Sequence, residues 1–238
     1  KQRAMTSQYK IHILITGASR GIGAAIAAAF APDTALVVAL SSKDGDLSDP
    51  DVPAKLWATS LAELGGRVDV LINNAGIFEA NPLDAGDADW LASWNRTMQV
   101  NLTASAELCR YAVLHWQQSK SKGRIVNVAS RAAHRGDSPA HWHYAASKAG
   151  MVAMTKTIAR AYASQGIYAF AICPGFTMTG MAKDYLESRG GDKLLADIPL
   201  GKVADPEEVA AIAKFCALDA PPSMTGAILD VNGASYVR

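Results

Sequence analysis

A tyrosine and a lysine, Tyr144 and Lys148, lie four residues apart, downstream of Ser130. In a helix, this spacing places the phenol and the ammonium on the same face. A positive charge beside a phenol favours the ionised form, so Lys148 is expected to lower the pKa of Tyr144 from its ordinary value of about 10. A tyrosine tuned in this way can act as a general acid or base near neutral pH. Taken alone, the pair is also typical of an ordinary surface helix with a half-buried ring.

Composition limits the classes of protein that need to be considered. The 238 residues are 50% hydrophobic and 19% charged, which suits one globular domain with a large core, expected over residues 5–238. The net charge of +1 favours neither nucleic acid nor a membrane surface as a partner. No apolar run approaches the ~20 residues of a membrane span, and residues 1–10 lack a signal-peptide pattern. The three scattered cysteines lack metal-ligand spacing, which favours reduced thiols and a cytoplasmic location.

The elements that would position the tyrosine begin with a glycine-rich stretch near the N-terminus. It follows an apolar run at residues 11–15 and precedes an alanine-rich helix expected at residues 22–30. Strand, glycine turn and helix form the context of a phosphate-binding loop, because glycine admits a close backbone approach and the helix N-terminus offers free N–H donors. The glycine spacing, G-x-x-x-G-x-G from Gly17 to Gly23, differs from G-x-G-x-x-G. A tight turn without a ligand is the alternative for this loop alone.

Several motifs together make the chain resemble the classical short-chain dehydrogenases/reductases. The family's T-G-x-x-x-G-I-G loop falls at residues 16–23, its N-N-A-G motif at residues 73–76, and its P-G motif at residues 174–175. Its four catalytic positions match Asn101, Ser130, Tyr144 and Lys148. The motifs occur in the family's order over essentially the whole chain, so their joint signal is stronger than that of any one of them.

The resemblance implies a fold and an activity. The fold is α/β, a single doubly wound (Rossmann-type) parallel sheet with helices on both faces. The activity is NAD(P)-dependent transfer of a hydride between nicotinamide and a ketone or secondary alcohol. Tyr144 would be the general acid–base, and Ser130 would stabilise the same substrate oxygen. Lys148 would lower the Tyr144 pKa and bind the nicotinamide ribose. Asn101 would open its helix and hold a water that passes protons to Lys148, although a satisfied buried amide is the alternative.

The resemblance also implies which residues bind the cofactor. They come from the glycine loop, the end of the second strand, the N-N-A-G motif, the catalytic helix and the segment after the P-G motif: Gly17, Ser19, Arg20, Gly21, Ile22, Gly23, Ser41, Ser42, Asp46, Leu47, Asn74, Ala75, Gly76, Tyr144, Lys148, Pro174, Gly175, Thr177 and Thr179.

The end of the second strand, expected at residues 35–40, indicates which nicotinamide cofactor is preferred. In the family, an acidic residue there binds the adenosine ribose hydroxyls and excludes a 2′-phosphate. Here the strand tip reads Leu-Ser-Ser-Lys, with hydroxyls and Lys43 in place of a carboxylate, and Arg20 precedes the second glycine. This pattern favours NADP(H), while ordinary solvated surface is the alternative for both cations. NAD(H) stays possible, because Asp44 or Asp46 lies close enough in sequence to approach the ribose.

The connection after this strand departs from the family pattern. Asp46-Leu47 resembles the pair that ends the family's third strand, yet it follows the second strand almost at once. A parallel crossover needs a dozen or more residues. The usual crossover helix between strands two and three is therefore expected to be missing, with strand three very short or lost and the adenosine side of the pocket more open. Residues 49–64 read as a helix.

Other expectations concern partners, a lid and metals. In relatives, the helical region ending near residue 118 and the Tyr144 helix pack against a second subunit, which implies a homodimer or homotetramer. Residues 181–199 are expected to form either a lid over the substrate or a plain packed helix pair. His134, His141 and His143 lack an acidic companion at ligand spacing, so no metal is expected. His141 or Trp142 is a candidate for the substrate mouth.

Two rival functions need to be weighed. The first is reduction of a 3-oxoacyl thioester, an activity that shares this overall pattern. Reductases that act on a carrier protein often have a basic residue just before the glycine that matches Gly166, and Gln165 stands there in this chain. The second is a non-catalytic dinucleotide-binding sensor. Such a sensor would have no physical need for the four catalytic-type side chains at Asn101, Ser130, Tyr144 and Lys148.

Overall fold

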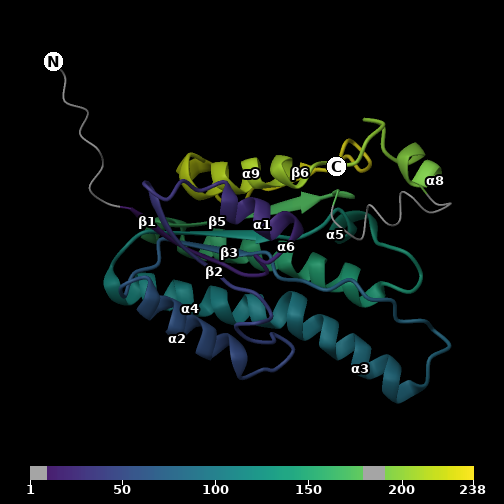
Figure 1. Ribbon diagram of the computed structural model, residues 1–238, viewed down its shortest axis with the longest axis horizontal. Coiled ribbons are helices and arrows are strands. Elements are labelled where there is room, and N and C mark those ends of the chain that lie inside the picture. Colours follow the sequence, from purple (N-terminus) through teal and green to yellow (C-terminus); the bar gives the residue numbers. More distant parts are fainter. Residues whose placement is uncertain (1–9, 179–190) are drawn as a thin grey trace.

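A single parallel sheet lies at the centre of the protein. The computed structural model describes residues 10–178 and 191–238, without the side chains of residues 192–194. In these ranges six strands pair in the order β2-β1-β3-β4-β5-β6 (Figure 1). The strands are β1 (Ile11–Ile15), β2 (Ala35–Ala39), β3 (Val70–Asn73), β4 (Gly123–Val128), β5 (Ile167–Pro174) and β6 (Ile228–Val231). The order reverses between β1 and β3, and a parallel sheet binds ligands beside such a switch point at its carboxyl edge.

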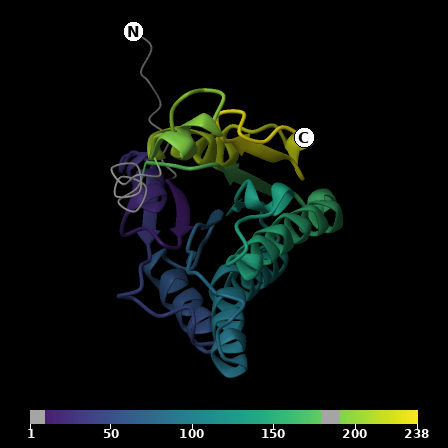
Figure 2. The same ribbon diagram turned by 90° about the vertical axis from the view of Figure 1, so that its right-hand side faces the viewer.

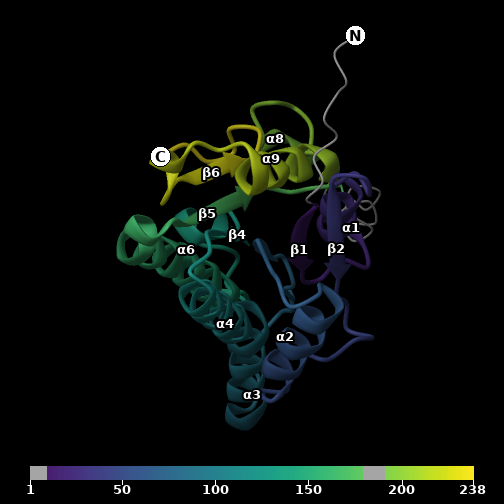
Figure 3. The ribbon, with the colours of Figure 1, turned by 90° about the vertical axis from the view of Figure 1, so that its left-hand side faces the viewer.

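Helices cover both faces of this sheet. Helices α1 (Gly21–Ala28) and α9 (Pro206–Leu218) pack on one face, and α2 (Val52–Glu63), α4 (Ala104–Ser119) and α6 (Trp142–Tyr162) pack on the other. The end-on view of Figure 3 shows the two helix layers on opposite sides of the strands. Figure 2 shows the teal and green helices below the yellow C-terminal segments. This arrangement confirms the predicted doubly wound α/β fold.

The strands form the core because their side chains alternate between the two layers. In β1, Ile13 and Ile15 face the layer of α1 and α9, whereas Leu14 faces the other layer. The same alternation recurs in β3, where Leu71 lies between two residues of the opposite face. Since parallel strands are covered on both faces, almost every position is apolar, and the sequence reads as continuous apolar runs.

The long helical region of the middle third contains a π-helical turn. Helix α3 (Asp87–Met98) passes into a π-helix at Gln99–Thr103 before α4 begins. The N-cap of α3 is Gly86, and Asp87 is already helical. At α9, Asp205 and Glu208 form a reciprocal capping box, with Pro206 at the first helical position.

The connection from β2 to β3 lacks the crossover helix and the third strand of the family pattern. Residues 40–51 form turns in place of a third strand, and α2 then crosses over β1 to reach β3. The strand expected at Asp46-Leu47 is thus lost, together with the helix that would have preceded it. As a result, β2 is an edge strand of the sheet, and Leu36 on it is 40% exposed.

The carboxyl ends of all six strands meet at one end of the molecule. The arrow of β5 points to this end in Figure 1, where α5 (Ala132–Arg135) and α8 (Gly191–Ala196) also lie. Most of the segment expected to form a lid falls at residues 179–190, which lie outside the described residues. In the described ranges, none of the helices combines the length and the apolar character needed to cross a membrane.

Candidate active site

The glycine loop after β1 is locked to the loop after β3. The buried Thr16 hydroxyl accepts hydrogen bonds from the backbone N–H groups of Asn74 and Ala75, each at 3.1 Å. In return, the Asn74 side-chain amide donates to the carbonyl oxygen of Gly17 at 2.9 Å. The T-G and N-N-A-G motifs thus form one rigid unit at the carboxyl edge of the sheet.

Two of the loop's glycines are required by this close packing. Gly17 has a φ of +68°, which only glycine adopts readily, and a Cβ there would lie 2.6 Å from the Cα of Ala75. A Cβ at Gly23 would overlap the carbonyl oxygen of Gly17. Without side chains at these two positions, the loop packs directly against the backbone of the N-N-A-G loop and of its own first turn.

The N-terminus of α1 suits an anion. Arg20 is its N-cap, and no side chain in the described ranges caps the helix, whose first turn also lacks acidic residues. Free backbone N–H groups and the helix dipole are thus left for a phosphate. Ser19 and Arg20 are exposed beside Gly21 and Ile22. These predicted cofactor residues lie together and fit a dinucleotide.

The Asp44 carboxylate, one of the two that could approach the ribose, lies at the tip of β2. Asp44 accepts hydrogen bonds from the backbone N–H of Ser41 at 2.7 Å and from its hydroxyl at 2.9 Å. These bonds lower the pKa of Asp44, so it is ionised at neutral pH. Ser42 is exposed beside it. Ser41, expected to face a 2′-phosphate, already has a negatively charged partner.

The predicted adenine-side pair lies in the turns after β2. Asp46 accepts a hydrogen bond from the backbone N–H of Ser48 at 2.9 Å, which lowers the pKa of Asp46. Leu47 is half-buried and packs against the core on the side of α2. Both residues keep their place near the carboxyl edge even though their strand is lost.

Asn101 lies at the centre of the π-helical turn, buried and fully hydrogen-bonded. Its side-chain oxygen accepts from the backbone N–H of Ile77 at 2.8 Å, and its amide donates to the Ile77 carbonyl at 3.0 Å. The amide also lies 3.2 Å from the hydroxyl of Ser147 on α6. The expected local opening of the helix is therefore present, and Asn101 connects it to the loop after β3.

Ser130 and Tyr144 come together at the carboxyl end of β4. Ser130 follows β4 and accepts a hydrogen bond from the backbone N–H of Ala132 at 3.1 Å, which fixes its hydroxyl. Tyr144 projects from the first turn of α6, and the Ser130 side chain lies close enough to the phenol to influence its pKa. The hydroxyls of Ser130 and Tyr144 therefore lie where a single substrate carbonyl oxygen could contact both.

Burial sets the pKa of Tyr144 in a direction that the sequence did not predict. Desolvation raises the pKa of this phenol, and the nearby Ser130 side chain opposes the shift only in part. Lys148 does not produce the expected lowering, because its Nζ lies 5.9 Å from the Tyr144 ring centroid and donates to the carbonyl oxygen of Val128 at 2.9 Å. The unliganded protein therefore holds Tyr144 in its protonated form.

Lys148 is itself strongly affected by its surroundings. The side chain is only 4% exposed, and this burial lowers the pKa of Lys148 to about 8. Its Nζ lies close to Asn101 and Gly76, since a Cβ on Gly76 would meet both within 3.4 Å. Asn101, Lys148 and the N-N-A-G loop thus share one small volume beside Tyr144.

The P-G motif closes the site from the side of β6. Pro174 pairs with Val231 across the two strands, and a Cβ on Gly175 would lie 2.9 Å from Asn232. Thr177 is buried, and its hydroxyl donates to the Gly175 carbonyl at 3.3 Å. Thr179 lies outside the described residues.

An aromatic wall beside Tyr144 contains one residue that sequence reasoning missed. Phe78 stacks on His141 with ring centroids 3.9 Å apart, and its ring meets Tyr144 edge-on at 4.8 Å. The hydroxyl of Ser138 lies 2.6 Å from the Nδ1 of His141 and fixes that ring. Phe78 follows the N-N-A-G motif by two residues, and an aromatic residue at that place was the available signal. His141 was expected here, whereas Trp142 points more into solvent and is 54% exposed.

Comparison with known proteins agrees with this geometry. A family model described as enoyl-(acyl carrier protein) reductase matches residues 41–234. The chain is 36% identical to a 3-oxoacyl-(acyl-carrier-protein) reductase of Vibrio cholerae, in an alignment that covers 94% of this chain and 96% of the relative. It is 32% identical to an acetoacetyl-CoA reductase of Shinella zoogloeoides, covering 94% and 97%. The solved structure of aldohexose dehydrogenase from Thermoplasma acidophilum matches with a TM-score of 0.84 and 27% identity, covering 98% and 96%.

Proposed function

Because the chain belongs to the short-chain dehydrogenase/reductase family, we propose that it reduces the 3-oxo group of an acyl thioester with NADPH. Membership makes it an NAD(P)-dependent oxidoreductase of the ketone and secondary-alcohol class. The observation that carries the proposal is the proximity of Ser130 to the Tyr144 phenol, with Lys148 between that ring and the N-N-A-G loop. Relatives named for 3-oxoacyl and acetoacetyl thioesters support the choice of substrate class.

The proposed mechanism uses the two hydroxyls on one substrate oxygen. The bound nicotinamide supplies the hydride. Tyr144 donates its proton to the carbonyl oxygen, and Ser130 donates a hydrogen bond that stabilises the charge developing there. Because burial raises the pKa of Tyr144, the phenol carries the proton that reduction requires at neutral pH. In oxidation, Tyr144 would first have to lose this proton.

Lys148 and Asn101 act behind the tyrosine in this proposal. Lys148 would bind the nicotinamide ribose, and with the cofactor bound its charge would stabilise the tyrosinate left after proton transfer. Asn101 holds the loop after β3 against α6 through Ile77 and Ser147. Its expected role in a proton relay to Lys148 remains part of the proposal.

A substrate comparison tests the thioester assignment. With NADPH, acetoacetyl-CoA is expected to give a kcat/KM at least tenfold above that of acetoacetate methyl ester, which lacks the thioester and its long polar carrier group. Oxidation of an aldohexose with NADP⁺ should be slower still. A higher kcat/KM on the aldohexose would reject the substrate class while leaving the oxidoreductase itself intact. Since Gln165 is not basic, a carrier protein is not expected to improve on coenzyme A.

The proposed preference for NADP(H) has NAD(H) as its rival. Arg20 and Lys43 are exposed near the tip of β2, where cations would contact a 2′-phosphate. The hydrogen bond that holds Asp44 beside Ser41 favours NAD(H). The Asp44 carboxylate would repel the 2′-phosphate of NADP(H) and would accept hydrogen bonds from the ribose hydroxyls of NAD(H).

Replacing Asp44 separates the two cofactors. Asp44→Asn removes one negative charge without changing the size of the side chain. It is expected to tighten NADPH binding by about five- to tenfold, because an exposed like charge at contact distance costs about 1 kcal/mol. Asp49→Asn is the matched control, because Asp49 is also exposed and accepts a hydrogen bond from the backbone N–H of Asp51. Nicotinamide fluorescence titrations with NADPH and NADH give both dissociation constants. A wild type that prefers NADH, with weaker NADH binding in Asp44→Asn, would reverse the assignment.

We propose that the protein assembles as a homodimer or homotetramer through α4 and α6. A shallow groove runs between these two helices and is lined by Ala106, Arg110, Leu114, Met154 and Ile158. Leu114 is 36% exposed there. An apolar groove between two long helices is suited to the same surface of a second copy. A monomer mass in sedimentation equilibrium would contradict this.

The cellular compartment is also a proposal. Cys109, Cys173 and Cys216 are all buried and free of disulfides. Reduced thiols are typical of proteins that work in the cytoplasm. We therefore assign the protein to that compartment.

A further inference from the structure

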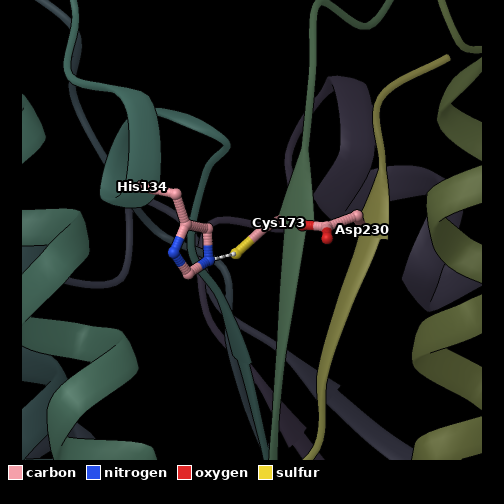
Figure 4. A group of neighbouring side chains, drawn as sticks. All are labelled: His134, Cys173 and Asp230. Carbon is pink, nitrogen blue, oxygen red and sulfur yellow. Dashed lines mark hydrogen bonds between the residues drawn. The ribbon is translucent and has the colours of Figure 1, made fainter. Parts of the chain in front are cut away.

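We propose that His134, Cys173 and Asp230 bind a divalent cation of the zinc class at the edge of the active site. The three residues come from α5, β5 and β6, and their ligand atoms all lie within 4.8 Å of one another. Figure 4 shows the Cys173 thiol pointing at the imidazole of His134, with the Asp230 carboxylate beside it. Imidazole nitrogen, thiolate sulfur and carboxylate oxygen are the ligands that zinc takes in proteins.

The spacing of two of these atoms already suits a metal. Cys173 Sγ lies 3.6 Å from His134 Nε2. A tetrahedral zinc bound to both atoms at ordinary bond lengths would hold them about 3.6 Å apart. The carboxylate of Asp230 needs a movement of about 1 Å to complete a three-ligand set, which leaves a fourth position for water. The alternative is a simple thiol–imidazole hydrogen bond.

One neighbour shields the ligands and another competes for one of them. The ring of Tyr236 lies parallel to His134 at 5.8 Å and shields it. On the other side, Arg238 Nε donates to Asp230 Oδ2 at 3.1 Å. A bound cation would therefore have to share the Asp230 carboxylate with the Arg238 guanidinium or displace the guanidinium from it.

The cluster is joined to the catalytic residues. Cys173 directly precedes Pro174, and the backbone N–H of Arg131, the residue after Ser130, donates to the Pro174 carbonyl oxygen at 2.9 Å. His134 belongs to the short helix that follows Ser130. On binding, the thiol releases its proton to solvent, and the new sulfur–metal bond ties the Ser130 loop to β5. The sequence offered no sign of this group, because the His134–Cys173 and Cys173–Asp230 separations are 39 and 57 residues.

Cobalt and zinc titrations of the whole protein test the site. Added Co²⁺ is expected to give a thiolate-to-cobalt charge-transfer absorption at one equivalent, and Zn²⁺ should displace it. Cys173→Ser should abolish the absorption, and His134→Gln should weaken Zn²⁺ binding by at least about tenfold. Cys216→Ser is the matched control, because burial raises the pKa of both thiols to about 11, and it should bind like the wild type.

A second variant should strengthen binding. Arg238→Gln removes the competing cation from Asp230, so its affinity for Zn²⁺ is expected to rise several-fold. Zinc should also raise the melting temperature of the wild type but not of Cys173→Ser, because only the folded site binds the ion. The proposal is overturned if Co²⁺ gives no thiolate absorption in the wild type, if the absorption survives in Cys173→Ser, or if Arg238→Gln weakens binding. None of these readouts depends on the substrate, so they stand apart from the reductase assignment.

Discussion

Tyr144→Phe is expected to lower kcat for carbonyl reduction by about 10²–10⁴-fold or more, the range assigned to general acid–base catalysis. The change removes only the hydroxyl that meets Ser130, and the ring keeps its edge-on contact with Phe78. Dinucleotide binding should stay nearly unchanged, because the glycine loop is held by Thr16 and Asn74. Steady-state assays with NADPH, together with fluorescence titration of the cofactor, measure the two effects separately.

A second tyrosine of the same helix serves as the control for this experiment. Tyr162 lies in the last turn of α6, far along the helix from Ser130, so Tyr162→Phe should retain the kcat of the wild type. Ser130→Ala should lose turnover without losing the proton donor, and its effect is expected to be smaller than that of Tyr144→Phe. If Tyr144→Phe keeps a near-normal kcat, Tyr144 is not the acid.

Lys148→Met is expected to inactivate the enzyme and, without cofactor, to make it more stable at neutral pH. Burial lowers the Lys148 pKa from 10.5 to about 8, so holding the charge in the folded protein costs about 3 kcal/mol. Loss of the hydrogen bond to Val128 offsets about 1 kcal/mol of the gain. The remaining gain of about 2 kcal/mol should raise the melting temperature by about 4–8 °C in a chain of this size.

The pH dependence of this gain follows from the two pKa values. Below pH 8, Lys148 is charged in both the folded and the unfolded protein, and the folded state bears the full cost. Between about pH 8 and 10.5 the folded state releases the proton first, so the stability contributed by this group rises with pH. The advantage of Lys148→Met should therefore shrink from neutral pH toward about pH 10.

Thermal melts of the wild type and of Lys148→Met at neutral pH and at about pH 10 provide the measurement. Lys156→Met is the matched control, because Lys156 is exposed on the same helix, and it should leave the melting temperature almost unchanged. A Lys148→Met variant that melts at or below the wild type at neutral pH would show that the buried ammonium carries no such cost.

Features built from neighbouring residues were predictable from the sequence. The alternation in β1, the glycine loop and the capping box of α9 are each determined within a few residues, and all three are present. The loss of the third strand was also predictable, because too few residues separate β2 from Asp46 to hold a crossover. These are constraints of chain length and local geometry.

Features that depend on distant residues were not predictable. The sequence places a charge near Tyr144 but does not show how much water the fold removes from the phenol, so the expected direction of its pKa was wrong. The stack of Phe78 on His141 joins segments that follow different strands.

The turns that replace a third strand have a consequence for the rate of the catalytic cycle. With β2 at the edge of the sheet, one wall beside the adenosine half of a dinucleotide is reduced to the turns of residues 40–51. A nucleotide with less contact surface has a shorter residence time, since differences in affinity arise mostly in the dissociation rate. In many enzymes of this kind the release of product limits turnover. The shortened edge therefore favours rapid exchange of the spent nucleotide over tight retention.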